Sequence, residues 1–190
     1  MKIINKASVL GFFTGFICFP IIFFVGGYVF VNFALNGFDN AVSLDPPEMP
    51  SEQCVNLDWQ VKTLDGREVN LKEHVGGKAV FLNFWATWCP PCVAEMPSID
   101  TLYELFGDTM VFVCISQENA ETLKKFLQHK QYSFPVFYSE IPPPQELNAA
   151  ALPTTFIMSS DGKILLKHVG GADWAHESVV AFLRETLAQG

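Results

Sequence analysis

Two cysteines separated by two prolines directly follow an apolar run, and this arrangement restricts the possible folds more than any other feature of the chain. Residues 79–85 form that run, which is typical of a central strand buried on both faces. A helix is predicted to begin at Pro90, because proline is tolerated in the first turn of a helix, and to end before Gly107. Cys89 then lies where the strand meets the helix, and Cys92 lies one turn further along.

The spacing of Cys89 and Cys92 favours redox chemistry. The positive end of the helix dipole stabilises a thiolate on Cys89, and Cys92 can reach the same sulfur to close a disulfide with little backbone movement. The alternatives are half of a zinc site, a static structural disulfide and two core cysteines. A zinc site would need a second pair of ligands, which the four histidines do not supply at ligand spacing. A static bridge around so small a loop would restrict the unfolded chain only modestly.

The remaining patterns alternate between strands and helices, which predicts an α/β fold with a central mixed sheet flanked by helices. The predicted elements are a hairpin over residues 57–70 with its turn at Asp65-Gly66, a strand at 79–85, a helix from Pro90 to Phe106, a strand at 110–115, a helix capped by Asn119, a strand at 134–138, a brief helix at 145–150, a hairpin of strands 155–158 and 163–169 around Ser160-Asp161-Gly162, and a final helix at 176–188.

The N-terminal part of the chain is long and apolar. Residues 7–38 carry no charge. A helix of about 20 residues crosses a hydrocarbon core of roughly 30 Å, so residues 7–35 are predicted to form a single transmembrane helix in the lipid bilayer. A cleaved secretory signal is the alternative, but its apolar region usually has only about 7 to 15 residues. We therefore expect an uncleaved anchor.

The charges around this segment predict its orientation. Lys2 and Lys6 precede it, which places the N-terminus in the cytoplasm, and acidic residues follow it. The expected organisation is a cytoplasmic tip and transmembrane anchor at residues 1–38, a proline-rich linker at 39–50, and a soluble domain at 51–190. That domain would lie in the periplasm or otherwise outside the cytoplasm, on a single-pass protein of the cell (inner) membrane.

The charge balance excludes one class of partner. Twelve Lys and Arg residues stand against twenty Asp and Glu residues, which gives a formal net charge of -8. No basic cluster is present that could follow a phosphate backbone, so no nucleic acid partner is expected.

Several separate motifs together resemble the TlpA/ResA-like branch of the thioredoxin superfamily. The motifs are Asn83-Phe84-Trp85-Ala86-Thr87-Trp88-Cys89-Pro90-Pro91-Cys92, then Glu95 and Pro97, then Leu152-Pro153-Thr154-Thr155-Phe156, and finally Gly171-Ala172-Asp173-Trp174. The resemblance covers about residues 55–188 and implies a thioredoxin-like fold and a thiol-disulfide oxidoreductase that needs no cofactor and no metal. The Pro-Pro dipeptide and the additional Cys54 and Cys114 depart from the pattern. Whether Cys54 and Cys114 pair or stay free is left open, although Cys114 is expected to fill core volume.

The resemblance also implies roles for residues near the dithiol. Cys89, at the exposed end of the helix, would attack the partner's disulfide, and Cys92 would resolve the mixed disulfide. Glu95 would take the proton from Cys92, because residues three apart on a helix lie on adjoining turns. A solvated surface glutamate is the alternative for Glu95.

The peptide bond between Leu152 and Pro153 is cis by the same resemblance, and Pro153 would pack against the dithiol. The Leu152 backbone would then pair with an extended substrate segment, and Trp88, with Pro90 and Pro91, would contact the substrate. A trans proline that opens an edge strand is the alternative for Pro153, and plain packing is the alternative for Trp88.

The expected activity is reduction of disulfides in extracytoplasmic proteins, of the kind needed for cytochrome c maturation or metal-site assembly. A monomer is expected, re-reduced by a membrane electron conduit of the DsbD or CcdA type. Pro90 and Pro91 lack the amide N–H groups that would stabilise a Cys89 thiolate, which favours the reducing direction. The alternatives are an oxidase or isomerase, and a Cu(I) chaperone with His168 as a loose candidate for a further ligand.

Overall fold

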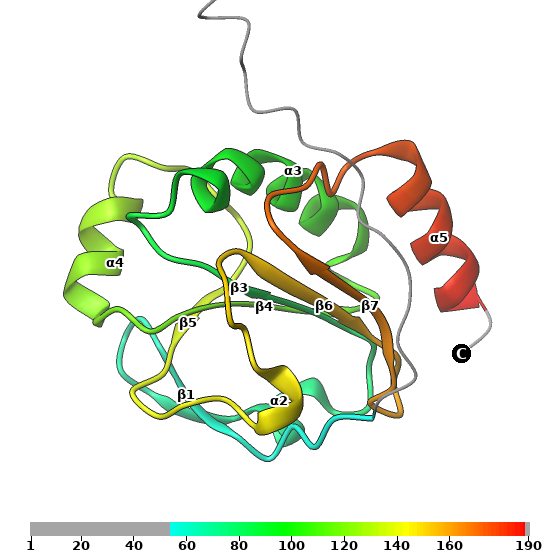
Figure 1. The fold of residues 1–190 in the computed structure, drawn as a ribbon, viewed down its shortest axis with the longest axis horizontal. Helices are drawn as coiled ribbons and strands as arrows, with labels where there is room; N and C mark the ends of the chain where they lie inside the picture. The colour runs from blue at the N-terminus through cyan, green and yellow to red at the C-terminus, as the bar shows by residue number, and fades with distance from the viewer. Residues whose placement is uncertain (1–53, 189–190) are drawn as a thin grey trace, which may run out of the picture. The chain divides into compact units, whose positions relative to one another are not determined.

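The computed structural model describes residues 54–188, and Figure 1 shows their arrangement. The elements are β1 (Gln60–Thr63), β2 (Glu68–Asn70), α2 (Leu71–Val75), β3 (Val80–Phe84), α3 (Pro90–Phe106), β4 (Val111–Ser116), α4 (Ala120–Leu127), β5 (Val136–Tyr138), the 3₁₀ helix η1 (Gln145–Leu147), β6 (Thr154–Met158), β7 (Ile164–Val169) and α5 (Glu177–Ala188). The predicted order of strands and helices is confirmed.

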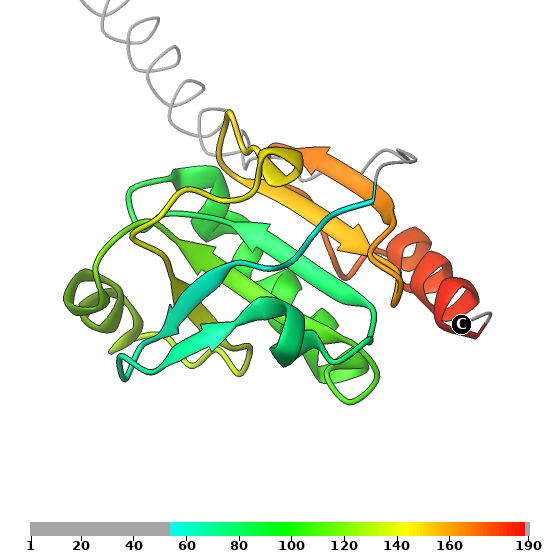
Figure 2. The same ribbon diagram turned by 90° about the horizontal axis from the view of Figure 1, so that it is seen from below.

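The strands form one mixed sheet with β3 near its centre. Their order is β2-β1-β5-β4-β3-β6-β7. β3 and β4 are parallel, as are β4 and β5, whereas β6 runs antiparallel to both β3 and β7. The β1–β2 hairpin joins the other side of the sheet through antiparallel pairing of β1 with β5, as Figure 2 shows. The predicted α/β fold with a mixed central sheet and an N-terminal hairpin is therefore confirmed.

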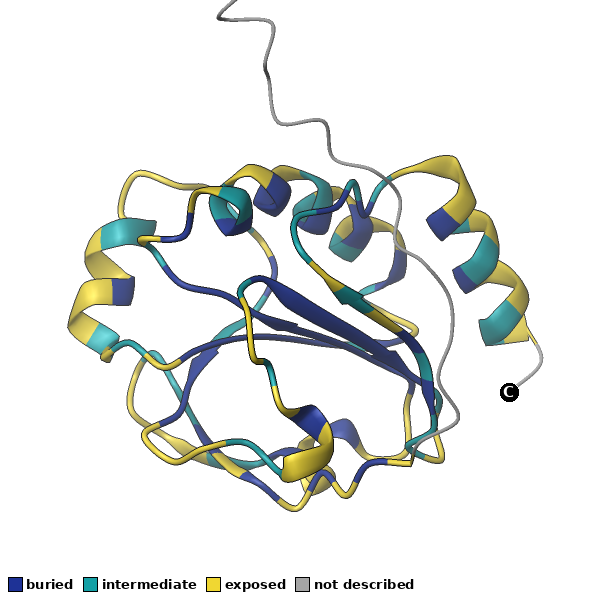
Figure 3. Cartoon of the chain, viewed as in Figure 1, coloured by how far each residue is buried: buried dark blue, intermediate teal, exposed yellow. Residues whose placement is uncertain are grey.

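The central strands are buried on both faces because helices and loops cover each side. Phe81 of β3 packs in the cluster that contains residues of α3, α4 and α5, whereas Val80 and Leu82 pack in the opposite cluster, with the N-terminal segment, α2 and η1. Every residue of β3 and of β6 is buried, as the dark blue strands in Figure 3 show. The apolar run in the sequence reflects this double burial.

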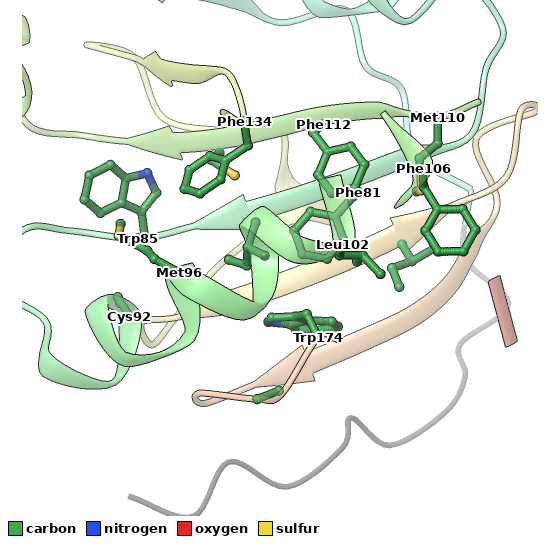
Figure 4. Close-up of a cluster of buried hydrophobic side chains, with 14 of the residues drawn as sticks. Phe81, Trp85, Cys92, Met96, Leu102, Phe106, Met110, Phe112, Phe134 and Trp174 are labelled. Atoms are coloured by element: carbon green, nitrogen blue, oxygen red, sulfur yellow. The ribbon is translucent and has the colours of Figure 1, made fainter. Parts of the chain in front are cut away.

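Helix α3 carries one side of the main core. It begins at Pro90 and ends at Phe106, as predicted. Figure 4 shows Leu102 on the helix near the aromatic rings of Phe81 and Phe112, and Met96 nearer the start of the helix, toward Trp85. Gly107 follows the helix at a close approach, since a Cβ there would lie 2.8 Å from the Tyr103 carbonyl oxygen. A side chain at position 107 would therefore force the end of the helix to shift.

The short helix α2 was not predicted from the sequence. Five residues are too few to show a helical period, but Asn70 caps the helix by accepting hydrogen bonds from the N–H groups of Lys72 and Glu73. Gly76 ends it with a left-handed backbone at φ 57°. The predicted helix at 145–150 is only the single 3₁₀ turn η1.

The predicted membrane anchor and linker lie outside the described residues. The division into residues 1–38, 39–50 and 51–190 stays a prediction. Between residues 54 and 188, no helix is long and apolar enough to cross a membrane.

Candidate active site

Cys89 and Cys92 form a disulfide at the start of α3, with their Cα atoms 5.3 Å apart. Cys89 is the N-cap residue, and its Sγ accepts a hydrogen bond of 3.4 Å from the backbone N–H of Cys92. Prolines occupy the first two positions of the helix, so Cys92 supplies the first backbone N–H of α3. The helix N-terminus thus directs one donor at the Cys89 sulfur.

Both cysteines are largely buried in this oxidised state. Cys89 is 4% exposed and Cys92 is fully buried, and both belong to the cluster beneath α3. The prediction that Cys89 lies at an exposed helix end is therefore wrong for the disulfide form, because the N-cap residue packs into the core cluster. Figure 4 shows Cys92 on the first turn of the helix, at one end of this cluster.

Glu95 lies one turn after Cys92 and is fully buried. Its Oε2 accepts hydrogen bonds from Trp174 Nε1 at 2.9 Å and from the Ala172 backbone N–H at 3.2 Å. Its Oε1 accepts a third bond, of 2.8 Å, from Asn83 Nδ2. The alternative of a solvated surface glutamate is therefore wrong, and the carboxyl group lies inside the domain, on the helical turn that follows Cys92.

Burial changes the acidity of this group. It raises the pKa of Glu95 from 4.5 to about 7, although the hydrogen bonds from Trp174, Asn83 and Ala172 act in the opposite direction. A carboxyl group with a pKa near 7 both takes up and releases a proton near neutral pH. Glu95 therefore has the acidity that proton exchange with a neighbouring thiol requires.

Asn83 connects this carboxyl group to β6, the strand that directly follows Pro153. Its Nδ2 donates to Glu95 and also, at 2.8 Å, to Thr155 Oγ1 on β6. Thr155 follows Pro153 by two residues, and the Leu152–Pro153 peptide bond is cis, the isomer that the resemblance implied. The site thus joins residues of β3, α3, β6 and the loop before α5.

An open groove lies beside the loop that precedes Cys89. It has a volume of about 680 Å³ and is lined by the β3–α3 loop up to Trp88, by the β4–α4 loop and by the segment that precedes Pro153. Trp88 is 71% exposed at its wall, and Leu152 is half-buried there. Pro90 is exposed and Pro91 half-buried at the start of the helix. Trp88 and Leu152, both predicted to contact substrate, thus lie together on one accessible surface.

Sequence reasoning identified Cys89, Cys92 and Glu95 but missed the partners of Glu95. Asn83, Ala172 and Trp174 were noted only as members of motifs. The Gly171-Ala172-Asp173-Trp174 motif was the available signal, because a buried tryptophan N–H usually needs an acceptor.

The two other cysteines among residues 54–188 do not pair. Cys54 is exposed and Cys114 is buried, and both are free. Burial, followed by the charges of Glu95 and Asp100, holds the pKa of the Cys114 thiol well above its usual value, which suits a core-filling thiol. The ring of His168 packs edge-on against Trp174, with centroids 5.9 Å apart. In the described part of the chain, no three His, Cys, Asp or Glu residues gather where they could hold a metal ion.

Comparison with known proteins places this site in a family. A family model described as Redoxin matches residues 48–183. The chain belongs to the Redoxin family. It is 35% identical over 117 residues to the thioredoxin-like protein YneN of Bacillus subtilis, which covers 60% of this chain and 68% of that protein. It is 34% identical over 123 residues to the thiol-disulfide oxidoreductase ResA of Halalkalibacterium halodurans, which covers 63% and 68%.

Solved structures with the same fold support the architecture. StoA from Bacillus subtilis superimposes with a TM-score of 0.53 at 24% identity, over 63% of this chain and 92% of that chain. The pneumococcal exposed lipoprotein thioredoxin from Streptococcus pneumoniae superimposes with a TM-score of 0.54 at 23% identity, over 70% and 99%. The chain is a thiol-disulfide oxidoreductase of the ResA type with a thioredoxin-like fold.

The hydrogen bond from Trp174 should be measurable in the acidity of Glu95. Trp174→Phe removes a donor that stabilises the carboxylate, so the pKa of Glu95 should rise further, by about 1 to 2 units for a hydrogen bond to a charged group. Trp85→Phe is the matched control, because the Trp85 indole is equally buried but its Nε1 has no partner among the described residues. Carbon-13 NMR titration of the side-chain carboxyl group gives both values. Equal pKa values in the two variants would contradict the assignment.

Glu95 should also make the stability of the oxidised protein depend on pH. The unfolded chain releases the Glu95 proton near pH 4.5 and the folded chain only near pH 7, so the folded state binds more protons between these values. The free energy of unfolding should therefore fall as pH rises through this window, by roughly 3 kcal/mol relative to Glu95→Gln. Urea unfolding of the disulfide form from pH 4 to 8 measures this difference. Glu104→Gln, an exposed position on the same helix, should keep the wild-type slope.

Proposed function

We propose that the protein is a membrane-anchored, extracytoplasmic reductase of protein disulfides. The observation that carries this proposal is the helix N-terminus at Cys89. Because Pro90 and Pro91 occupy the first two helical positions, a single backbone N–H, that of Cys92, donates to the Cys89 sulfur. A thiolate with few donors is weakly stabilised, so its reduced form gives up electrons readily.

The reaction runs through two exchanges. The Cys89 thiolate attacks one sulfur of the partner's disulfide, which forms a mixed disulfide and releases the partner's other sulfur as a thiolate. Cys92 then loses its proton to Glu95 and attacks the Cys89 sulfur, which breaks the mixed disulfide and releases the second partner sulfur. Two electrons pass to the partner, and Cys89 and Cys92 end as the observed disulfide.

We assign partner binding to the groove beside the loop that precedes the dithiol. Trp88 adds a large exposed apolar side chain to the lining of this groove. The segment 149–152, which precedes Pro153, also lines it. An extended partner segment would lie here, with its backbone beside that of Leu152. The chain has a formal net charge of -8, which would repel a phosphate backbone, so a nucleic acid partner is not proposed.

The cellular setting follows from the sequence of the first 50 residues. A helix at residues 7–35 would anchor the protein in the cell membrane, and the linker at 39–50 would extend the catalytic domain outside the cytoplasm. Reducing power would then come from a membrane conduit of the DsbD or CcdA type, which reduces the Cys89–Cys92 disulfide after each cycle. The substrates would be proteins in cytochrome c maturation or metal-site assembly. The reductase would act on them as a monomer.

The reducing direction predicts a low reduction potential. Equilibration with a glutathione or dithiothreitol series should give a value near that of thioredoxin, about -270 mV, and far from DsbA at about -120 mV. Pro91→Ala restores a backbone N–H at the second helical position, so it should raise the potential by up to about 30 to 60 mV, the worth of a hydrogen bond to a charged group. Pro97→Ala, within the same helix but further from the sulfurs, is the control. A wild-type potential close to that of DsbA would indicate an oxidase or isomerase instead.

Trapping identifies the natural partners. Cys92→Ser leaves Cys89 able to attack but unable to be released, so mixed disulfides should accumulate on partner proteins in membranes and be released by dithiothreitol. Cys89→Ser, which lacks the attacking sulfur, should accumulate none. Equal adduct formation by both variants would remove Cys89 from the attacking role.

A further inference from the structure

Glu118 holds the loop that precedes the attacking cysteine. It lies between β4 and α4, and its Oε2 accepts a hydrogen bond of 2.6 Å from the backbone N–H of Thr87. Its Oε1 accepts a second bond, of 2.7 Å, from Thr87 Oγ1. Thr87 stands two residues before Cys89, so one carboxylate binds both donors of a residue in the active-site loop.

Glu118 holds the middle of the loop over residues 85–89. The loop is fixed at its start by the bond from Trp85 N–H to the Ile115 carbonyl, at 3.1 Å, and at its end by the bond from Cys89 N–H to the Ala86 carbonyl, at 3.2 Å. Thr87 and Trp88 lie between these points. Trp88 is 71% exposed, so packing contributes little to its position.

Glu118 is itself held by Ser116, the last residue of β4. Its backbone N–H donates to Ser116 Oγ at 3.2 Å, and Ser116 Oγ lies 3.3 Å from Glu118 Oε2. β3 and β4 are parallel, so the loops that follow them meet at the same edge of the sheet, as Figure 1 shows. Ligand sites of α/β sheets form at this edge.

Hydroxyl and N–H donors of Thr87 and Ser116, and no cation of the described part of the chain, contact the carboxylate of Glu118. The one ion pair among residues 54–188 joins Lys62 to Glu140. A half-buried carboxylate without a cationic partner depends on hydrogen-bond donors for its stabilisation, and Thr87 supplies two short ones. Glu118 also lines the groove beside Trp88. Its contacts therefore act on the loop that presents Trp88 and Cys89.

We propose that Glu118 is a positioning residue for thiol-disulfide exchange, which holds Thr87 so that Trp88 and Cys89 keep one orientation toward the partner's disulfide. The inference rests on the proposed function, because it assigns to Glu118 the presentation of the groove and the attacking sulfur to a protein partner. It goes beyond the dithiol and Glu95, which carry the chemistry.

Three variants of the full chain separate positioning from other roles. Glu118→Ala removes both bonds to Thr87. Glu118→Gln keeps an oxygen that accepts from the Thr87 N–H and supplies an N–H₂ that donates to Thr87 Oγ1, but it removes the charge. Glu121→Ala removes an exposed acidic residue three positions further on and is the matched control for net charge.

Two measurements are made on each variant. The kcat/KM for reduction of insulin disulfides should fall by about 10- to 100-fold in Glu118→Ala, because small displacements of reacting groups carry penalties of this size. It should stay within about 3-fold of wild type in Glu118→Gln and Glu121→Ala. Nitrogen-15 relaxation should give Trp88 backbone order parameters typical of rigid structure, about 0.85, in wild type and Glu118→Gln, and clearly lower ones in Glu118→Ala.

The possible results are distinct. Wild-type rate and order in Glu118→Ala would overturn the proposal, and so would a Glu118→Gln variant as slow as Glu118→Ala, since the charge would then be the active property. A lower order parameter without a lower rate would also overturn it. A wild-type chain that fails to reduce insulin would instead contradict the proposed function, before any variant is compared.

Discussion

The burial of the Glu95 carboxyl group is the constraint on which the rest of this structure depends. A carboxyl group with no exposed surface is stable in a fold only if donors surround it. Here the three donors come from Asn83 on β3 and from Ala172 and Trp174 before α5, up to 79 residues away in the sequence. The helix that carries the dithiol is thereby tied to the centre of the sheet and to the C-terminal part of the domain.

The same burial lowers the stability of the fold at neutral pH but gives Glu95 a pKa suited to proton transfer. It raises the pKa of Glu95 to about 7, so the fold is less stable at neutral pH than near pH 4. An apolar residue of similar volume would avoid this pH dependence, but it would leave the N–H groups of Asn83, Ala172 and Trp174 without an acceptor. A buried ionisable group one helical turn after a redox cysteine is the arrangement expected when proton transfer, and not stability, determines the choice of residue.

Local signals account for what could be predicted from the sequence. The bounds of α3 follow from Pro90 and Gly107, and the double burial of β3 follows from its apolar run, because each depends on neighbours in the chain. The contacts of Glu95 depend on residues far apart in the sequence, so spacing alone left its burial open. Similarly, only the packing of β4 shows that Cys114 is isolated in the core. The short helix α2 has too few residues for a periodic signal.

The two sulfurs of the dithiol differ because each has different surroundings at the start of α3. Cys89 lies at a helix N-terminus from which proline has removed two of the first three donors, so the dipole remains while the hydrogen bonds are reduced to one. Cys92 lies one turn inside the helix, fully buried, with the Glu95 carboxyl group on the following turn. The Cys89 thiolate is therefore only modestly stabilised, whereas Cys92 has a proton acceptor on the next turn of the same helix. This asymmetry fits an exchange in which Cys89 attacks first and Cys92 needs help to lose its proton, and it follows from proline and glutamate placed within six residues of Cys89.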